Sequence, residues 1–206
     1  MIPGLLWARP YVQGCLLAAV GIALSLGSVH ARTDNSPQSL FNGTDLTGWQ
    51  AVGAAIWRVE DDMIVGGGPD QEGDGFLLHP GVVTDFELSV QFSIDSQTNS
   101  GVFIRCQDMQ RIHPETCFEL NIWDEHPNQA ARTGAIVFRA MPPLATVHTL
   151  DGWNTLRVIA RGDQIRVYVN GERTAELTDA SLPAGFIALQ RWGGGEVRFR
   201  SIEISR

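Results

Sequence analysis

The chain has 206 residues, with 15 basic and 23 acidic side chains and a formal net charge of −8 at pH 7. This length supports one domain with a proper hydrophobic core and argues against two independent ones. The acidic balance opposes binding to polyanions, so nucleic acid is excluded as a partner and a small neutral or cationic molecule is the expected ligand class.

Residues 1–31 have the pattern of a signal peptide. They carry Arg9, then the apolar run 15–26, then small residues that predict cleavage after Ala31. The apolar run is shorter than the ~20 residues that a membrane-spanning helix needs, so no membrane span is predicted. We therefore expect an exported protein, periplasmic or extracellular, in which the polar residues 32–39 form a flexible tether before a domain at 40–206.

The predicted domain consists of short apolar runs separated by turn signals, without sustained helical periodicity. In 86–94 apolar and polar residues alternate along the whole run, which is typical of a strand with one buried and one wet face. Asn170-Gly171 is a strong signal for a two-residue hairpin turn. The other predicted strands are 57–59, 63–65, 76–78, 99–105, 118–124, 134–138, 153–160, 164–169, 173–177, 185–190 and 197–204. This pattern predicts an all-β fold, a two-sheet antiparallel sandwich.

The central hairpin, 99–105 and 118–124, flanks a long polar loop. Alternation divides the second run into two faces. One face carries Phe118, Leu120 and Ile122, and the other carries Glu119, Asn121 and Trp123. A carboxylate, an amide and an indole in a row resemble a sugar-binding surface, because the ring stacks on the sugar while the polar groups bind its hydroxyls. The predicted partner is therefore a small-molecule saccharide.

Arg105 ends the first run of this hairpin. A lone arginine at a strand end is most often part of a surface salt bridge of little energetic value. On a face shared with Glu119 and Asn121, however, its rigid guanidinium would suit an anionic oxygen that develops during a reaction.

Two cysteines, Cys106 and Cys117, stand at the edges of the polar loop, and export would allow a disulfide between them. If they faced each other in regular register, Ile104 would lie opposite Glu119, and Arg105 would point away from that glutamate. Either the cysteines are unbridged or out of regular register, or the arginine and the glutamate do not share a face. We predict the shared face.

Other catalytic patterns are weak. The chain has no Gly-x-Ser-x-Gly, His-Glu-x-x-His or Cys-x-x-Cys motif, so nucleophilic-serine, zincin and redox chemistry are poorly supported. The run Asp124-Glu125-His126 could ligate a divalent metal or hold a general base. The alternative is a charged loop at a strand end.

On these residues the chain resembles the 3-keto-disaccharide hydrolase family, which has a concanavalin A-like jelly-roll fold. The matching segments are 40–43, Leu46, 48–49, 85–88, 99–105, 118–122, Asp124, 133–136, 153–154, 170–171, 187–190 and 197–202. Two positions depart from the family pattern. Arg191-Trp192 stands where many members have a histidine, and Asn121 stands where a glutamine is common.

The resemblance implies cleavage of 3-keto-glycosides. A ketone at C3 acidifies the C2 proton, a base removes it, the aglycone leaves C1 by elimination, and water then adds. Under this resemblance the base or metal-ligand candidates are Glu119, Asp124 and His126, the enolate stabiliser is Arg105, the hydroxyl-binding residues are Asn99, Asn121 and Gln190, and the stacking residue is Trp123 or Trp192. The alternative function is a non-catalytic, lectin-like carbohydrate-binding module. No motif specifies the sugar, the aglycone or the oligomeric state.

Overall fold

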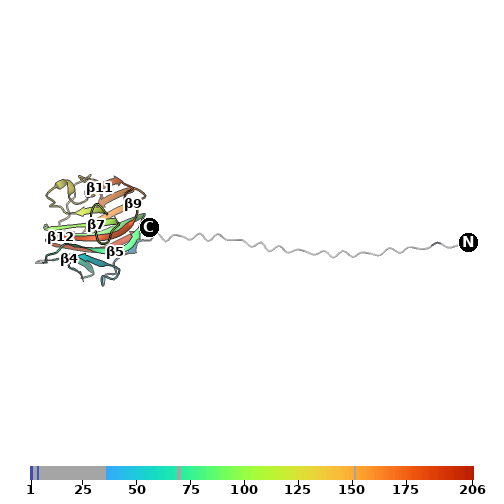
Figure 1. Cartoon of the computed structure of the whole chain (residues 1–206), viewed down its shortest axis with the longest axis horizontal. Helices are drawn as coiled ribbons and strands as arrows, with labels where there is room; N and C mark the ends of the chain where they lie inside the picture. The colour runs from blue at the N-terminus through green and yellow to red at the C-terminus, as the bar shows by residue number, and fades with distance from the viewer. Residues whose placement is uncertain (2–3, 5–35, 69–70, 151) are drawn as a thin grey trace. The chain divides into compact units, whose positions relative to one another are not determined.

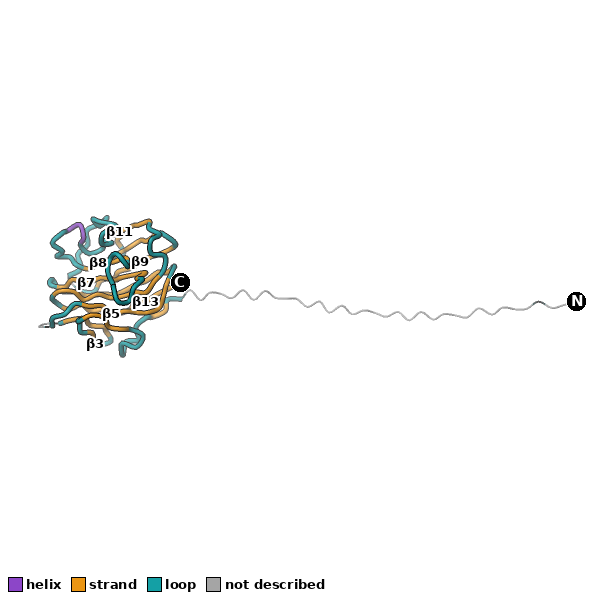
Figure 2. The backbone as a smooth tube through the Cα atoms, in the orientation of Figure 1, coloured by secondary structure: helices purple, strands orange, loops and turns teal. Residues whose placement is uncertain are grey.

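Nearly all of the regular secondary structure among the described residues is β-strand, as the computed structural model shows (Figures 1 and 2). The structure describes residues 1, 4, 36–68, 71–150 and 152–206. The predicted signal peptide falls almost wholly outside these residues. Within the described ranges there is one short 3-10 turn, η1 (Gln129–Ala131), and no helix has the length and apolar character needed to cross a bilayer.

Two antiparallel sheets hold the strands, which confirms the predicted all-β sandwich. The larger sheet has the order β11-β10-β9-β6-β13-β4-β3, with β1 paired to β13, and the smaller has the order β2-β5-β12-β7-β8. The larger contains β1 (Gln38–Ser39), β3 (Trp57–Glu60), β4 (Met63–Gly67), β6 (Phe86–Ile94), β9 (Asn154–Arg161), β10 (Gln164–Val169), β11 (Glu172–Thr178) and β13 (Glu196–Ser205). The smaller contains β2 (Gln50–Gly53), β5 (Gly75–Val83), β7 (Thr98–Cys106), β8 (Phe118–Ile122) and β12 (Gly185–Gly193).

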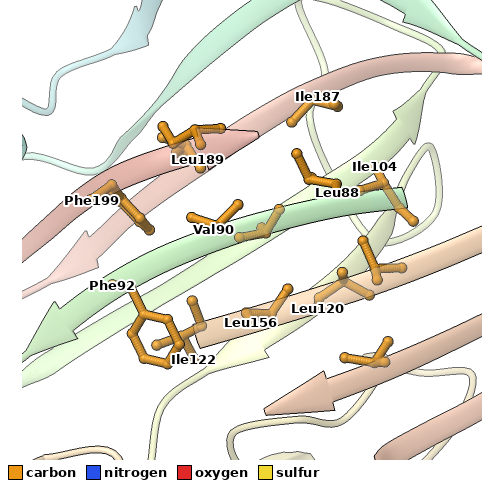
Figure 3. Close-up of a cluster of buried hydrophobic side chains, with 14 of the residues drawn as sticks. Leu88, Val90, Phe92, Ile104, Leu120, Ile122, Leu156, Ile187, Leu189 and Phe199 are labelled. Atoms are coloured by element: carbon orange, nitrogen blue, oxygen red, sulfur yellow. The ribbon is translucent and has the colours of Figure 1, made fainter. Parts of the chain in front are cut away.

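The hydrophobic core lies between the two sheets. Strand β6 contributes the alternating residues predicted from its sequence, and each of them is at most 5% exposed. Figure 3 shows side chains of β6, β9 and β13 packed against side chains of β7, β8 and β12. The labelled residues are Leu88, Val90, Phe92, Leu156 and Phe199 from the larger sheet and Ile104, Leu120, Ile122, Ile187 and Leu189 from the smaller. Burying one such side chain contributes about 1.5–3 kcal/mol, so this interface is the main source of stability.

Two hairpin turns have left-handed backbone, and the second of them was predicted from the sequence. Strands β3 and β4 are joined through Asp61 and Asp62, which have φ of 49° and 59°. Strands β10 and β11 are joined through Asn170 and Gly171, which have φ of 52° and 83°. Asparagine, aspartate and glycine tolerate this left-handed backbone, which matches the twist of the flanking strands.

One predicted boundary and one predicted strand differ from the structure. Strand β1 pairs with the end of β13, so the sandwich begins inside the segment predicted as a tether. Residues 134–138, predicted as a strand, do not form one. They follow the edge of β8 through hydrogen bonds from Val137 N to Glu119 O and from Asn121 N to Ala135 O. Phe138, with φ of 61°, then turns the chain away from strand geometry. This irregular edge segment becomes part of the candidate site.

Candidate functional site

The candidate site lies on the face of the smaller sheet that points away from the core. Phe76 pairs with Gln190, Gln190 with Gly101, and Gly101 with Asn121, which makes one row across four strands. In a neighbouring row Phe103 pairs with Glu119. Directly paired residues project to the same side of a sheet. The predicted division of β8 is therefore confirmed, because its other face belongs to the core.

These rows form the base of a hollow of about 250 Å³, which we call the Glu119 hollow. Gly101 contributes no side chain to the first row, and a Cβ there would crowd Gln190 Oε1 at 3.3 Å. The walls come from the loop between β7 and β8 and from the segment after β8. The lining residues are Phe76, Asn99, Phe103, Ile112, His113, Pro114, Glu119, Asn121, Trp123, His126, Val137, Phe138, Gln190 and Trp192.

Glu119 is the most unusual group in the hollow. It is only 8% exposed, and no described residue gives its carboxyl group a hydrogen bond or an ion pair. Burial without a compensating partner disfavours the charged form and raises the pKa of Glu119 to about 7. A carboxyl group with this pKa exchanges protons readily near neutral pH, which is what a general base requires.

The raised pKa of Glu119 predicts a pH dependence of stability. The folded protein holds the Glu119 proton more tightly than the unfolded chain, so this contribution is fully present below pH 4.5 and is lost as the pH rises through about 7. The loss amounts to about 3 kcal/mol of unfolding free energy. Urea unfolding between pH 4 and 8 measures it. The Glu119→Gln variant should lack this decline, while the surface variant Glu203→Gln should retain it, and identical pH profiles in all three proteins would contradict the prediction.

Gln190 and Asn99 present amide groups without partners. Gln190 is 6% exposed, its Oε1 has no hydrogen-bond partner, and no described residue bonds its amide nitrogen. Asn99, half-buried on β7, likewise has no side-chain hydrogen bond within the described part of the chain. Buried polar groups are nearly always satisfied in folded proteins. Both amides are therefore available for the hydroxyl groups of a ligand.

His126 lines the hollow beside Trp123. Their ring centroids are 4.4 Å apart in an edge-to-face arrangement. His126 Nδ1 accepts a hydrogen bond from the backbone N–H of Asn128 at 3.0 Å. In the neutral ring the proton must then lie on Nε2, so His126 can donate through that nitrogen.

Trp123, Trp192 and Asn121 differ in how exposed their side chains are and in whether other residues already bind them. Trp123 is half-buried, whereas Trp192 is 42% exposed and lies beside Phe76, with 6.2 Å between the ring centroids. Asn121 lines the hollow, but its amide donates to Ala131 O, and its Oδ1 accepts from the N–H of Ile122. Asn121 thus holds the segment after β8 in place as well as bordering the site.

Arg105 does not reach the hollow, and the predicted shared face with Glu119 is wrong. Its side chain is 0% exposed and donates to the carbonyl oxygens of three loop residues, with Asp85 3.6 Å away. The acceptors are Thr84 at 2.7 and 3.0 Å, Gly162 at 2.8 Å and Leu182 at 3.4 Å. A β-bulge is the cause.

The bulge adds one residue to β7. Opposite β12, Cys106 pairs with Phe186 and Phe103 with Ala188, so three steps along β7 match two along β12. Arg105, with φ of 51°, absorbs the extra residue. A one-residue shift reverses the face of every side chain beyond it. The bulge therefore turns Arg105 away from Glu119 and returns Cys106 to the outer face.

Cys106 and Cys117 form a disulfide on this face, which resolves the alternative left open by the sequence. It closes the loop 107–116, and this loop supplies Ile112, His113 and Pro114 to the wall of the hollow. We expect the double variant Cys106→Ser, Cys117→Ser to lose about 3 kcal/mol of unfolding free energy, the entropy of closing a loop of this size. Urea unfolding with and without reductant measures it. A loss below about 0.5 kcal/mol, within the range of ordinary surface substitutions, would contradict the expectation.

Asp124 does not line the hollow either, so the structure does not support its prediction as a base or ligand there. It is 4% exposed, its Oδ2 accepts from Thr149 N at 2.6 Å, and its Oδ1 accepts from Thr149 Oγ1 at 2.9 Å. Arg132 lies 3.9 Å away. Asp124 ties together two points of the long connection between β8 and β9. Among the described residues no group of three or more histidine, cysteine or acidic side chains is placed to hold a metal ion.

His113, Phe76, Phe103 and Phe138 line the hollow but were not predicted as site residues. Strand pairing and the disulfide loop bring them there from distant parts of the sequence. The spacing of the two cysteines was the only available signal, and it concerned the loop that carries His113.

The fold and the site together define a two-sheet β-sandwich that carries a hollow of about 250 Å³, lined by aromatic and amide side chains, on its outer face. Comparison with known proteins identifies the family. Residues 36–205 match the family described as the 3-keto-alpha-glucoside-1,2-lyase-like domain, and the chain belongs to this family. Its resemblance to the 3-keto-disaccharide hydrolases is thereby confirmed.

Individual relatives agree with this assignment. A 3-keto-disaccharide hydrolase of Bacteroides thetaiotaomicron is 31% identical over 80 residues, covering 34% of this chain and only 28% of that protein. A structure from Parabacteroides distasonis, provisionally assigned as a glycosyl hydrolase, has a TM-score of 0.70 and 26% identity, covering 82% of this chain and 98% of that one. The carbohydrate-binding module CBM66 from Bacillus subtilis shares the fold, with a TM-score of 0.61, 17% identity, and coverage of 77% and 96%.

Proposed function

We propose that the protein is an exported enzyme that cleaves 3-keto-glycosides. Glu119 is the observation that carries this proposal: an unpaired, buried carboxyl group with a pKa of about 7 in an aromatic-lined hollow. The family and the Bacteroides relative support a 3-keto-glycoside as the substrate.

In the proposed reaction Glu119 takes the proton from C2 of the sugar, which the C3 ketone acidifies. The C2–H electrons form an enolate with the C3 oxygen. As this enolate collapses, the C1–O bond breaks, and its electron pair leaves with the aglycone oxygen, which is then protonated. Water adds to C1 of the resulting enone, and C2 regains a proton, giving the free 3-keto sugar. This route needs one base, not the two flanking carboxylates of ordinary glycoside hydrolysis.

The lining of the hollow suits that route. Glu119 is the only carboxylate among the described lining residues. His126, with its Nε2 available, is the candidate proton donor to the ketone oxygen or the leaving group. Arg105 and Asp124, which lie elsewhere, are not part of this mechanism.

Neutral groups are proposed to bind the sugar. Gln190 and Asn99 have free amides for hydroxyl groups, and Trp123 or Trp192 offers an aromatic face for stacking. No arginine is among the described residues of the lining, so a neutral saccharide fits better than a charged one.

Export of the enzyme is also a proposal. The Cys106–Cys117 disulfide supports it, because disulfides persist in the periplasm and outside the cell. The signal-peptide pattern of residues 1–31 supports it independently.

The second candidate function is a carbohydrate-binding module without catalysis. The fold shared with CBM66 favours it. To separate the two, the purified protein is incubated with a 3-keto-disaccharide and with its unoxidised parent. The enzyme proposal expects release of the free 3-keto sugar from the keto substrate alone. Binding of either sugar without any product would leave the module as the function.

A further inference from the structure

A second hollow of about 370 Å³ adjoins the Glu119 hollow on the same face, and we call it the Val52 hollow. Four side chains border both: Phe76, Ile112, His113 and Trp192. The remaining lining comes from β2, the start of β5 and the disulfide loop, namely Val52, Gly53, Asp74, Gly75, Gln110 and Arg111. The two hollows are thus neighbours that share one wall.

One cross-strand row connects them. Val52 pairs with Phe76, and Phe76 pairs with Gln190, which faces the Glu119 hollow. These side chains project to the same side of the sheet. A ligand longer than one ring that occupies the Glu119 hollow can therefore continue along this row onto Val52.

We infer that the Val52 hollow binds the leaving group of the glycoside, and that this leaving group is a ring. The inference rests on the proposed function. Val52, Phe76 and Trp192 offer apolar surface at the base and shared wall, which suits the flat face of a sugar or an aromatic ring. Gln110 and Arg111 supply exposed polar groups at the rim.

The orientation follows from where the reactive groups lie. Glu119 and the unpartnered amide of Gln190 line only the first hollow, so the keto ring belongs there. The bond to be broken then lies near the wall shared by the hollows, which includes His113. His113 Nδ1 accepts the N–H of Glu115 at 3.3 Å, which leaves its Nε2 to carry the proton of the neutral ring.

The test fills the Val52 hollow without touching the first one. Val52→Trp adds a large side chain there, and Gln110→Trp fills the same space from the loop. Val82→Trp is the matched control, because Val82 is 65% exposed and borders neither hollow. Each variant is assayed with methyl, phenyl and glucosyl 3-keto-glucosides, after circular dichroism and thermal melting confirm that it is folded.

We expect Val52→Trp and Gln110→Trp to raise KM about tenfold for the phenyl or the glucosyl substrate, with the methyl substrate and the Val82→Trp control unchanged. An effect on phenyl alone identifies an aromatic aglycone, and an effect on glucosyl alone identifies a second sugar. Equal effects on all three substrates, or no effect of either filling variant, would overturn the inference.

A failure of the proposed function is separable from a failure of this inference. If wild-type protein consumes none of the substrates, the same series is measured as Kd by calorimetry. Weaker binding of the ring-bearing glycosides to the filled variants, with methyl glycoside binding unchanged, still supports a second-ring site. Equal Kd values for all glycosides in wild type and variants would overturn it.

Discussion

Glu119→Gln is expected to lower kcat/KM for a 3-keto-glycoside by about 10²–10⁴-fold, the usual contribution of a general base. Glutamine has the same shape as the protonated glutamic acid, so the hollow stays intact while the proton acceptor is lost. In wild type, kcat/KM should rise with pH through about 7, where the pKa of Glu119 lies, because the reaction needs the ionised form. Release of the free 3-keto sugar measures both effects.

The matched control is Glu203→Gln, a glutamate exposed on β13 in the other sheet. Its activity and pH profile should equal those of wild type. If Glu119→Gln kept more than about a tenth of wild-type activity, the loss would be below the range expected for a general base. Glu119 would then be a binding group, and the base would have to be sought elsewhere in the hollow.

Arg105→Ala is expected to cost about 3–5 kcal/mol of unfolding free energy, the scale of removing one partner from a buried charged network. The guanidinium of Arg105 donates to Thr84, Gly162 and Leu182, so its loss leaves three loop carbonyls unsatisfied and a void between them. Urea unfolding measures the change. Arg166→Ala is the control, since that arginine is exposed and pairs with Glu176 at the surface.

This variant also separates structure from chemistry. Because Arg105 lies outside the hollow, activity per folded molecule of Arg105→Ala should remain within about threefold of wild type, a change below 1 kcal/mol in barrier. A fully stable variant without activity would contradict the structural role and restore Arg105 as an enolate stabiliser.

The sequence was sufficient for the fold class, an all-β sandwich, because its strands alternate regularly. Residues 86–94 and 118–122 place the same side chains in the core that their period-two pattern predicts. The Asn170-Gly171 turn occurs where its left-handed preference requires. Residues 134–138 differ because one isolated bridge, between Ile136 and Leu120, and a few backbone hydrogen bonds hold them beside β8, so they do not form a strand of their own.

The predicted placement of side chains on the sheet face agrees with the structure where it depended on local alternation, and it was wrong where it depended on register. Glu119 and Trp123 share a face because they are an even number of positions apart, and side chains alternate between the two faces of a strand. Arg105 was assigned by counting along a regular strand, and one extra residue in β7 reversed its direction. Nothing in the sequence around 99–106 distinguishes a bulged strand from a regular one.

Distant partners were also invisible to local patterns. In the sequence Asp124 stands close to His126, which suggested that the two act together. In the structure the carboxylate of Asp124 accepts hydrogen bonds from Thr149, 25 positions further along the chain, and does not line the hollow. Phe76 reaches the site only through the pairing of β5 with β12. Such contacts depend on strand order, which one sequence does not specify.

Hydrogen exchange at C2 tests the role of Glu119 most directly. The protein is incubated in D2O with a 3-keto-glycoside, and deuterium at C2 of the recovered substrate and product is followed by NMR. The account predicts incorporation with wild-type protein and at least about a hundredfold slower incorporation with Glu119→Gln. Equal exchange rates for the two proteins would show that another group removes the C2 proton.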